Sequence, residues 1–575
     1  MTNKPMTDRP PMSPKLLAAL AAAAALLAGC ASPPSGPLLG GDPKAACEAL
    51  AGARIAPEQI VASGVGSGAA TIDSATLMAA APLAVAERGP TPAALITPAV
   101  PSYCKLLGRI APVDAKAPPI LFQVNLPTQW NGRSVQYGGG GFNGVLISGL
   151  SLLPAQRYDT PAPLAQGYVT VGTDSGHQNQ PNTPPQAFAL NDEALVNFAH
   201  ASYKKVRDVS VELMKRAYGR APEKMYFVGS SEGGREGLTM AQRYPEAFDG
   251  IFSRVPVINW TALQFAGTRN GLASMGDAWI RPPLAKLVGD AVLAACDQVD
   301  GLADGIVSNP KDCLRRVDVT RLRCAGAPND GCLSDAQINA IKTLHAPVRF
   351  DFDLAHGVRE YPGYGVSGEA APANGPTGGW MAWWSGRAAP VVPPLPDNGI
   401  AWFYGSGAIQ YFYARDPNFD VRKTDPNALK PRVLEVSALM DSTNPDLSAF
   451  HARGGKLIVL ENMSDFAQSP YAGIAYVDRV VQRMGPGRVN EFLRLYTAPG
   501  VDHVGAGAPG NVDLLAALTA WVERGRAPGE LQLVEQETKA PFAVKRARPL
   551  CEWPRYTQYK GGDVNAASSF ECKVD

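Results

Sequence analysis

A glycine-flanked serine between a predicted strand and a predicted helix constrains this chain more than any other stretch. The apolar run at 225–228 is typical of a buried strand, and residues 232–240 have a helical pattern. Between them stands G-S-S-E-G, in which only Ser231 has glycine both two residues before and two residues after. Neighbours without Cβ let a strand and a helix meet at a sharp turn. The stretch predicts a nucleophilic serine, and an ordinary glycine turn is the alternative.

The same turn predicts how a developing negative charge would be stabilised. The N–H of Glu232 opens the helix and points toward an oxyanion at the helix N-terminus. A second donor is expected from a glycine-rich loop, and the glycines at 138–141 directly follow a predicted strand at 134–137. We select Gly141 as that donor, and a flexible turn is the alternative.

A serine nucleophile needs a histidine base and a carboxylate that orients the histidine. In α/β-hydrolases these residues follow the order serine, acid, histidine. Of the six histidines, only His503 lies beyond both the serine and a carboxylate that follows a strand. Asp465, after the apolar strand at 456–460, is the predicted acid. Asp502 is the competitor, but adjacent side chains point apart; Asp478 lies within a predicted helix.

The order of the elements predicts the α/β class with a mostly parallel sheet. Predicted strands and helices alternate around Ser231. This alternation is absent from about residue 256 to residue 440 and returns afterwards. We predict a core at 46–255 and 441–575, interrupted by a large inserted lid domain at 256–440. Six of the nine tryptophans lie in the lid. The candidates for contact with a flat substrate, with an ordinary lid core as the alternative, are Trp383, Trp384, Trp402 and Phe403.

The first 30 residues are predicted to be a lipoprotein-type signal peptide. The apolar run at 16–27 follows a basic stretch and is shorter than the roughly 20 residues of a spanning helix. Leu-Ala-Gly before Cys30 resembles a lipobox, in which Cys30 is lipidated; a plain signal peptide with a chance cysteine is the alternative. Residues 31–45 are a predicted flexible tether. The expected location is the periplasm or the outer membrane, with secretion as a further option.

Eight cysteines remain when Cys30 is set aside, and an even number in an exported chain indicates disulfides. Pairing of neighbours in sequence is the simplest choice among many connectivities. A zinc site is the alternative, but the sequence has neither C-x-x-C nor a nearby histidine. The predicted pairs are Cys47–Cys104, Cys296–Cys313, Cys324–Cys332 and Cys551–Cys572.

An acidic stretch at 296–307, CDQVDGLADGIV, is a candidate cation site in the lid. Calcium takes several oxygen ligands from carboxylates and backbone carbonyls. The spacing differs from an EF-hand, and Asp-Gly turns that bind nothing are the alternative. The candidate ligands are Asp297, Asp300 and Asp304 through carboxylates and Leu302 and Ile306 through carbonyls. No organic cofactor is predicted, and a net charge of +1 without a basic patch argues against nucleic acid.

Taken together, these motifs resemble the tannase/feruloyl esterase family, which includes hydrolases of terephthalate monoesters. The likeness runs from about Cys47 to Cys572 and rests on the serine motif with its downstream Gly-Arg-Glu-Gly, CDQVDGLADGIV, the Asp465 and His503 loops, and Cys551 with Pro554. It implies a serine esterase with an α/β-hydrolase core, a large inserted lid and a structural Ca²⁺ in the lid. It assigns the triad to Ser231, Asp465 and His503, and the oxyanion N–H groups to Glu232 and Gly141.

Two departures from the family pattern stand out. The family usually has cysteines directly before the serine and directly after the histidine, where this chain has Ser230 and Val504. The histidine loop is then expected to be held by packing alone. Members that cleave terephthalate monoesters clamp the substrate carboxylate with a lid arginine. Here Arg387 and Arg415 only flank an arginine-free stretch.

The expected activity is hydrolysis of small aromatic esters through an acyl-enzyme, with feruloyl, galloyl and terephthaloyl monoesters all open. A lipase or general esterase is one alternative, and a non-catalytic periplasmic binding lipoprotein is another. The expected partner is the ester substrate, without nucleic acid, and membrane contact is expected only through a lipid anchor at Cys30.

Overall fold

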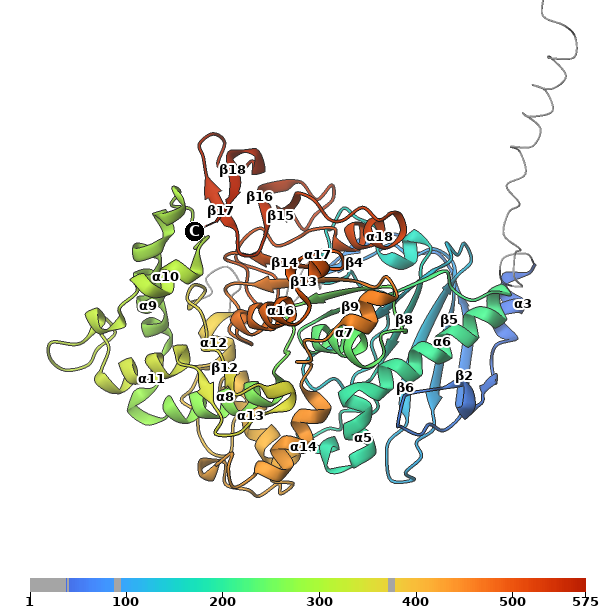
Figure 1. Ribbon diagram of the computed structural model, residues 1–575, viewed down its shortest axis with the longest axis horizontal. Helices are drawn as coiled ribbons and strands as arrows, with labels where there is room; N and C mark the ends of the chain where they lie inside the picture. The colour runs from blue at the N-terminus through green and yellow to red at the C-terminus, as the bar shows by residue number, and fades with distance from the viewer. Residues whose placement is uncertain (1–37, 39–40, 87–94, 371–377, 575) are drawn as a thin grey trace, which may run out of the picture.

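The structure is a computed structural model that describes Leu38 and residues 41–86, 95–370 and 378–574 (Figure 1). The predicted signal peptide, with Cys30, lies outside these residues, as does most of the predicted tether. The first full helix described is α3 (Pro43–Glu48), and the Asp42 side chain caps it by accepting the Lys44 N–H at 2.9 Å. Within the described ranges, the helices are too short or too polar to cross a bilayer.

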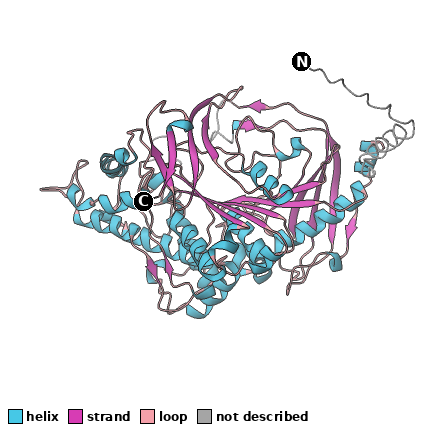
Figure 2. Cartoon of the chain, turned by 45° about the horizontal axis from the view of Figure 1, so that its top comes forward, coloured by secondary structure: helices cyan, strands magenta, loops and turns pink. Residues whose placement is uncertain are grey.

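A mixed sheet of twelve strands forms the centre of the molecule, and Figure 2 shows its twist. Neighbours from β8 to β14 run parallel, whereas the outer pairs on both sides are antiparallel. The strands, in spatial order, are β1 (Arg54–Ile55), β2 (Ala70–Met78), β5 (Tyr103–Ile110), β6 (Ile120–Pro127), β8 (Val169–Thr173), β7 (Arg133–Tyr137), β9 (Lys224–Ser230), β10 (Gly250–Arg254), β13 (Lys456–Asn462), β14 (Leu493–Ala498), β16 (Val544–Glu552) and β15 (Leu531–Gln536).

Helices cover both faces of the parallel strands, which explains why these strands are buried along almost their whole length. On one face, α6 (Ser202–Tyr218), α7 (Glu232–Arg243) and α16 (Pro470–Met484) pack around Phe227 and Val459. On the other face, α18 (Leu514–Arg524) packs against Tyr226 and Ile458. This is the predicted α/β architecture, and it leaves the carboxyl ends of the strands free to carry loops.

The described chain between β10 and β13 adds no strand to the large sheet and forms the lid. Figure 1 shows these helices gathered beside the sheet. Their own core is rich in aromatic residues, including Trp260, Trp380 and Phe412. The lid helices are α8 (Trp260–Ala273), α9 (Pro282–Cys296), α10 (Pro310–Arg316), α11 (Asp335–His345), α12 (Gly379–Trp383), α13 (Ile400–Ala408) and α14 (Lys430–Met440).

The remaining elements are short. Three helices, α5 (Asp192–Val196), α15 (Ser448–Ala452) and α17 (Pro486–Asn490), connect the longer ones. Three two-stranded sheets pair β3 (Ala84–Val85) with β4 (Ile96–Thr97), β11 (Val348–Arg349) with β12 (Glu360–Tyr361), and β17 (Tyr556–Tyr559) with β18 (Phe570–Lys573).

All four predicted disulfides are formed. Cys296–Cys313 joins the end of α9 to α10 and closes the acidic stretch of the lid. Cys551–Cys572 joins β16 to β18 near the C-terminus. In the chain-entropy account a closed loop of this size adds about 3 kcal/mol to the free energy of unfolding. Such bonds are consistent with export from the reducing cytosol.

Candidate active site

Ser231 occupies the sharp turn between β9 and α7 that the glycine pattern predicts. Its backbone angles are φ 61° and ψ −121°, a conformation that L-residues rarely adopt. A Cβ on Gly229 would lie 2.1 Å from the Gly233 carbonyl oxygen, and one on Gly233 would lie 2.7 Å from the Gly139 carbonyl oxygen. Both glycines are therefore required by close backbone approach. The Ser231 side chain stays partly exposed above the sheet.

Asp465 and His503 form the second part of the site. Asp465 follows β13 and His503 follows β14, so both lie at the same sheet edge as Ser231 after β9. His503 Nδ1 lies 2.7 Å from Asp465 Oδ2, which leaves Nε2 to exchange a proton. Asp465 Oδ1 accepts the N–H groups of Ala467 and Gln468 at 2.7 and 3.1 Å, so the carboxylate is fixed in orientation. No hydrogen bond joins Ser231 Oγ to His503 in the chain as described.

The competitor Asp502 has a different contact pattern. Its Oδ1 accepts the N–H groups of Val504, Gly505 and Ala506 at 2.9–3.1 Å. This carboxylate therefore shapes the loop that carries His503. The sequence argument that adjacent side chains point apart agrees with this arrangement.

The glycine loop after β7 places Gly141 in a left-handed conformation, with φ +58°. Within the described residues its N–H has no hydrogen-bond acceptor, as an oxyanion donor requires. Glu232, the first residue of α7, likewise has an N–H without an acceptor inside the helix. A Cβ on Gly141 would lie 2.8 Å from the Tyr404 hydroxyl, so the lid reaches the loop at this point.

Tyr404 is a site residue that the sequence reasoning missed. Its ring packs edge-on against Phe142 at a centroid distance of 5.0 Å, and its hydroxyl lies beside Gly141. The only sequence signal was its place next to the selected Phe403. Burial raises the pKa of the Tyr404 hydroxyl further above neutral, so the hydroxyl is protonated and can donate a hydrogen bond.

The four selected lid aromatics separate into two groups. The Trp383 ring lies 5.0 Å from the His503 ring at 72°, so it borders the site. Phe403 is half-buried beside Tyr404. Trp384 and Trp402 are only 2% and 1% exposed, and their indole N–H groups donate to the Asn270 and Val391 carbonyls. The structure corrects these two assignments, because both rings belong to the lid core.

Arg254, at the end of β10, was not singled out from the sequence and lies at the centre of the catalytic loops. Its Nη1 donates to Ser230 Oγ at 2.9 Å, and a Cβ on Gly505 would lie 3.0 Å from its Nη2. Burial lowers the pKa of this guanidinium, while the carboxylates of Asp465, Asp502 and Glu461 act in the opposite direction. Arg254 thus bonds to Ser230 in the serine turn and lies beside Gly505 in the histidine loop, next to Val504.

Of the two flanking lid arginines, Arg415 is already paired, and Arg387 is exposed. Arg415 pairs with Asp192 at 2.5 Å and donates to the Leu190 carbonyl at 2.7 Å, joining the lid to the core. The backbone N–H of Arg387 bonds to the Asp397 carbonyl at 2.7 Å, which fixes a lid turn.

The acidic stretch of the lid brings its three aspartates near one another. Burial raises the pKa of Asp297 and Asp300, and the charge of Asp304 adds to both increases. Asp300 accepts the Ser308 hydroxyl, and Asp304 pairs with Arg548 at 2.5 Å. Among the described residues, no group of three or more acidic, histidine or cysteine side chains is arranged to hold a metal ion.

Known proteins match most of this chain. A family profile described as Tannase and feruloyl esterase matches residues 104–573. An uncharacterized esterase of Agrobacterium fabrum is 39% identical over 82% of this chain and 86% of its own length. A mono(2-hydroxyethyl) terephthalate hydrolase of Piscinibacter sakaiensis is 32% identical over 85% of this chain and 87% of its own length.

Solved structures show the same fold. Feruloyl esterase B from Aspergillus oryzae superposes with a TM-score of 0.72 at 23% identity, covering 92% of this chain and 100% of that chain. A tannin acyl hydrolase from Aspergillus niger gives a TM-score of 0.66 at 23% identity, covering 90% of this chain and 94% of that chain.

Proposed function

This chain belongs to the tannase and feruloyl esterase family and is a carboxylic ester hydrolase, and from that premise we propose that it cleaves small aromatic esters through an acyl-enzyme on Ser231. The observation that carries this proposal is the buried Asp465–His503 pair at the sheet edge where the strained Ser231 turn also lies. A histidine held in one orientation and a serine on a strained backbone turn are the parts that acyl transfer needs.

The proposed chemistry has two half-reactions. His503 Nε2 accepts the Ser231 proton as Oγ attacks the ester carbonyl carbon, and the N–H groups of Glu232 and Gly141 stabilise the oxyanion. The protonated His503 then donates to the departing alcohol. In the second half-reaction His503 takes a proton from water, which attacks the acyl-enzyme and releases the carboxylic acid and free Ser231.

An aromatic acyl group is favoured because aromatic side chains surround the site. Trp383 borders His503, Phe403 and Tyr404 come from the same lid helix, and Tyr404 touches the loop of Gly141. Aromatic rings stack or pack edge-on with a flat substrate. The related proteins named for feruloyl esters and for mono(2-hydroxyethyl) terephthalate support the same class of substrate.

Turnover of a matched ester panel tests the proposal: methyl ferulate, methyl gallate, mono(2-hydroxyethyl) terephthalate and p-nitrophenyl esters of short and long chains. We expect the aromatic acyl esters to have the highest kcat/KM. Faster cleavage of long-chain p-nitrophenyl esters would replace the proposal with a lipase. No turnover of any ester, together with tight binding of aromatic acids, would replace it with a binding protein.

We also propose that the acidic lid stretch binds a structural Ca²⁺ through the carboxylates of Asp297, Asp300 and Asp304 and the carbonyls of Leu302 and Ile306. The oxygen donors and the mutual repulsion of the aspartates support a cation there. Two observations oppose it: Asp304 pairs with Arg548, so this carboxylate would have to be shared, and the described aspartate side chains are not arranged to hold a metal ion. The melting temperature, measured in EDTA and in added Ca²⁺, tests the proposal. We expect Ca²⁺ to raise the melting temperature of the wild type but not that of Asp297→Asn. Equal melting temperatures of the wild type in EDTA and in Ca²⁺ would reject the site.

The lipid anchor remains a proposal at Cys30, which lies in the part of the chain that the structure does not describe. Mass spectrometry of the protein from a bacterial membrane fraction tests it. An acylated N-terminal cysteine is the expected result, and an unmodified mature N-terminus elsewhere would contradict it.

A further inference from the structure

The two proposed oxyanion donors come from separate parts of the chain. The N–H of Glu232 opens α7, whereas the N–H of Gly141 lies in the loop after β7. An oxyanion needs both donors at about 3 Å from one point, so the separation between helix and loop must be fixed. Neither donor is held by a regular ladder of strand hydrogen bonds.

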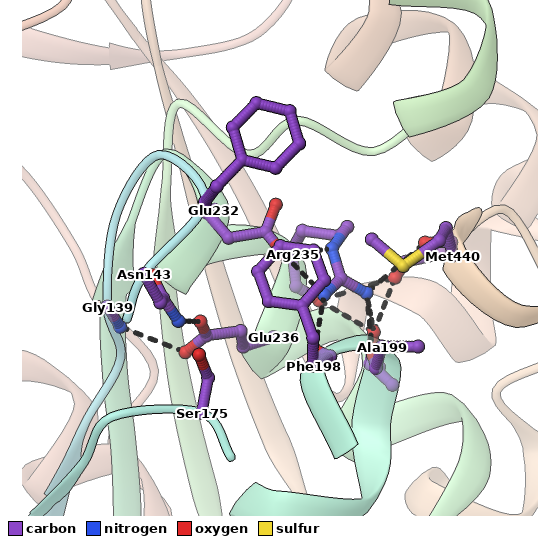
Figure 3. Close-up of polar contacts among 12 residues, drawn as sticks. Gly139, Asn143, Ser175, Phe198, Ala199, Glu232, Arg235, Glu236 and Met440 are labelled. Carbon is purple, nitrogen blue, oxygen red and sulfur yellow. Dashed lines mark hydrogen bonds and ion pairs between the residues drawn. The ribbon is translucent and has the colours of Figure 1, made fainter. Parts of the chain in front are cut away.

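Glu236, one turn into α7, connects these two parts. Figure 3 shows its side chain directed away from Arg235 and toward the loop. Its Oε2 accepts the Gly139 N–H at 3.0 Å, and its Oε1 accepts Asn143 Nδ2 at 2.7 Å. These contacts lie two residues before and two residues after Gly141. The Glu236 side chain is fully buried, so no water competes for its oxygens.

The backbone of the loop is packed against the same helix. A Cβ on Gly138 would lie 2.6 Å from the Gly233 Cα, and the Gly233 N–H donates to the Gly139 carbonyl at 3.1 Å. These contacts fix the start of the loop. Among the hydrogen bonds of the described residues, only the side-chain bond from Asn143 to Glu236 connects the far end of the loop directly to α7.

Asn143 adopts φ 46°, a left-handed conformation that asparagine and aspartate tolerate. Its Nδ2 also lies 3.1 Å from the Tyr203 hydroxyl, which in turn donates to the Phe198 carbonyl. Glu236, Asn143 and Tyr203 therefore form one buried network, in which the structure identifies the donor and the acceptor of each of these hydrogen bonds.

We propose that Glu236 is a positioning residue for the oxyanion hole: by accepting from both sides of Gly141, it fixes the distance between the loop donor and the donor at the start of α7. The inference rests on the proposed function, since it concerns the same reaction. A carboxylate with a purely structural role would affect the stability of the protein and leave the chemical step unchanged.

Glu236→Gln tests the proposal with the smallest change in shape. The amide has one acceptor oxygen, so either the Gly139 N–H or Asn143 Nδ2 loses its partner. The N–H donor at Gly141 then loses its fixed position, which weakens its hydrogen bond to the oxyanion, an interaction made only in the transition state. We expect kcat to fall by about 10- to 100-fold, with KM changed by less than about threefold, because one displaced donor is a large part of oxyanion stabilisation.

A second substitution should rescue the first. In Glu236→Gln combined with Asn143→Asp, the new amide donates to the new carboxylate and still accepts the Gly139 N–H. Both bonds to the loop then return, and only the bond to residue 143 has its direction reversed. The Tyr203 hydroxyl can donate to the new carboxylate in place of the Phe198 carbonyl. Asn143→Asp alone places two carboxylates together and should be at least as damaging as Glu236→Gln. We expect the double variant to recover at least about tenfold in kcat over the worse single variant.

Glu523→Gln is the matched control. Glu523 is also a largely buried glutamate with two partners, Arg133 and Tyr226, but Arg133 begins β7, at the sheet edge opposite Ser231. This variant should lower the melting temperature and keep kcat within about twofold.

Three outcomes would overturn the proposal: unchanged kcat in folded Glu236→Gln, equal losses of kcat in Glu236→Gln and Glu523→Gln, or no rescue by the double variant. Failure of the proposed function gives a different result, in which Ser231→Ala retains full turnover while the wild type remains active.

Discussion

The sharpest consequence of the site geometry is that a single methyl group on Gly141 should disable the oxyanion hole. The backbone has φ +58° there, which costs an L-residue about 1–2 kcal/mol. The added Cβ would lie 2.8 Å from the Tyr404 hydroxyl, closer than real Cβ contacts, so the loop or the lid side chain must move. Loss of one oxyanion donor lowers kcat by about 10²- to 10³-fold, and we expect Gly141→Ala to fall in that range.

The neighbouring glycine supplies the control. A Cβ on Gly140 would meet no atom within 4 Å, and its φ is not left-handed, so Gly140→Ala should keep kcat within about threefold. Combining Gly141→Ala with Tyr404→Phe removes the hydroxyl and leaves the nearest ring carbon at 3.6 Å, an ordinary contact. This double variant should recover part of the loss, since the backbone strain remains. Initial rates on the preferred ester, with melting temperatures for all variants, provide the assay. Equal kcat in Gly141→Ala and Gly140→Ala would refute the reasoning.

Two further predictions concern groups near the site. Burial raises the pKa of Glu369 to about 7 from its ordinary 4.5. The free energy of unfolding therefore decreases as the pH rises through that interval, and Glu369→Gln removes this decrease. The melting temperature of Glu369→Gln relative to wild type should therefore increase between pH 5 and pH 8, and a constant difference would contradict the assignment. Ser230 and Val504 line one cavity of about 300 Å³ together with Arg254, at the two positions where the family usually has cysteines. Ser230→Cys with Val504→Cys should therefore form a disulfide there. We expect a higher melting temperature that a reductant reverses; two free thiols in the oxidised, folded protein would show that the positions are too far apart.

Local chemistry explains which features could be predicted from the sequence. The Ser231 turn depends on glycines within a few residues, and the positions of Asp465 and His503 follow from strand ends, so all three could be placed at one sheet edge. Three of the disulfides close local loops of the chain, which is why pairing of sequence neighbours predicted them, whereas Cys47–Cys104 joins positions 57 apart.

Features that depend on contacts between distant segments were missed or misassigned. Trp384 and Trp402 are aromatic residues of the kind that line binding surfaces, but both pack against α8, Trp384 after α12 and Trp402 within α13. Arg254 ends an apolar strand and reaches Ser230, 24 positions away in sequence. Tyr404 meets Gly141 across the lid, a contact that no periodicity could reveal.

Covalent labelling of the serine tests the central claim most directly. A fluorophosphonate reacts only with a serine activated by a neighbouring base, and tryptic mass spectrometry identifies the modified residue. The account predicts stoichiometric labelling at Ser231, loss of ester turnover in parallel with labelling, and neither labelling nor turnover in folded Ser231→Ala. Label on another serine, or full turnover by Ser231→Ala, would contradict it.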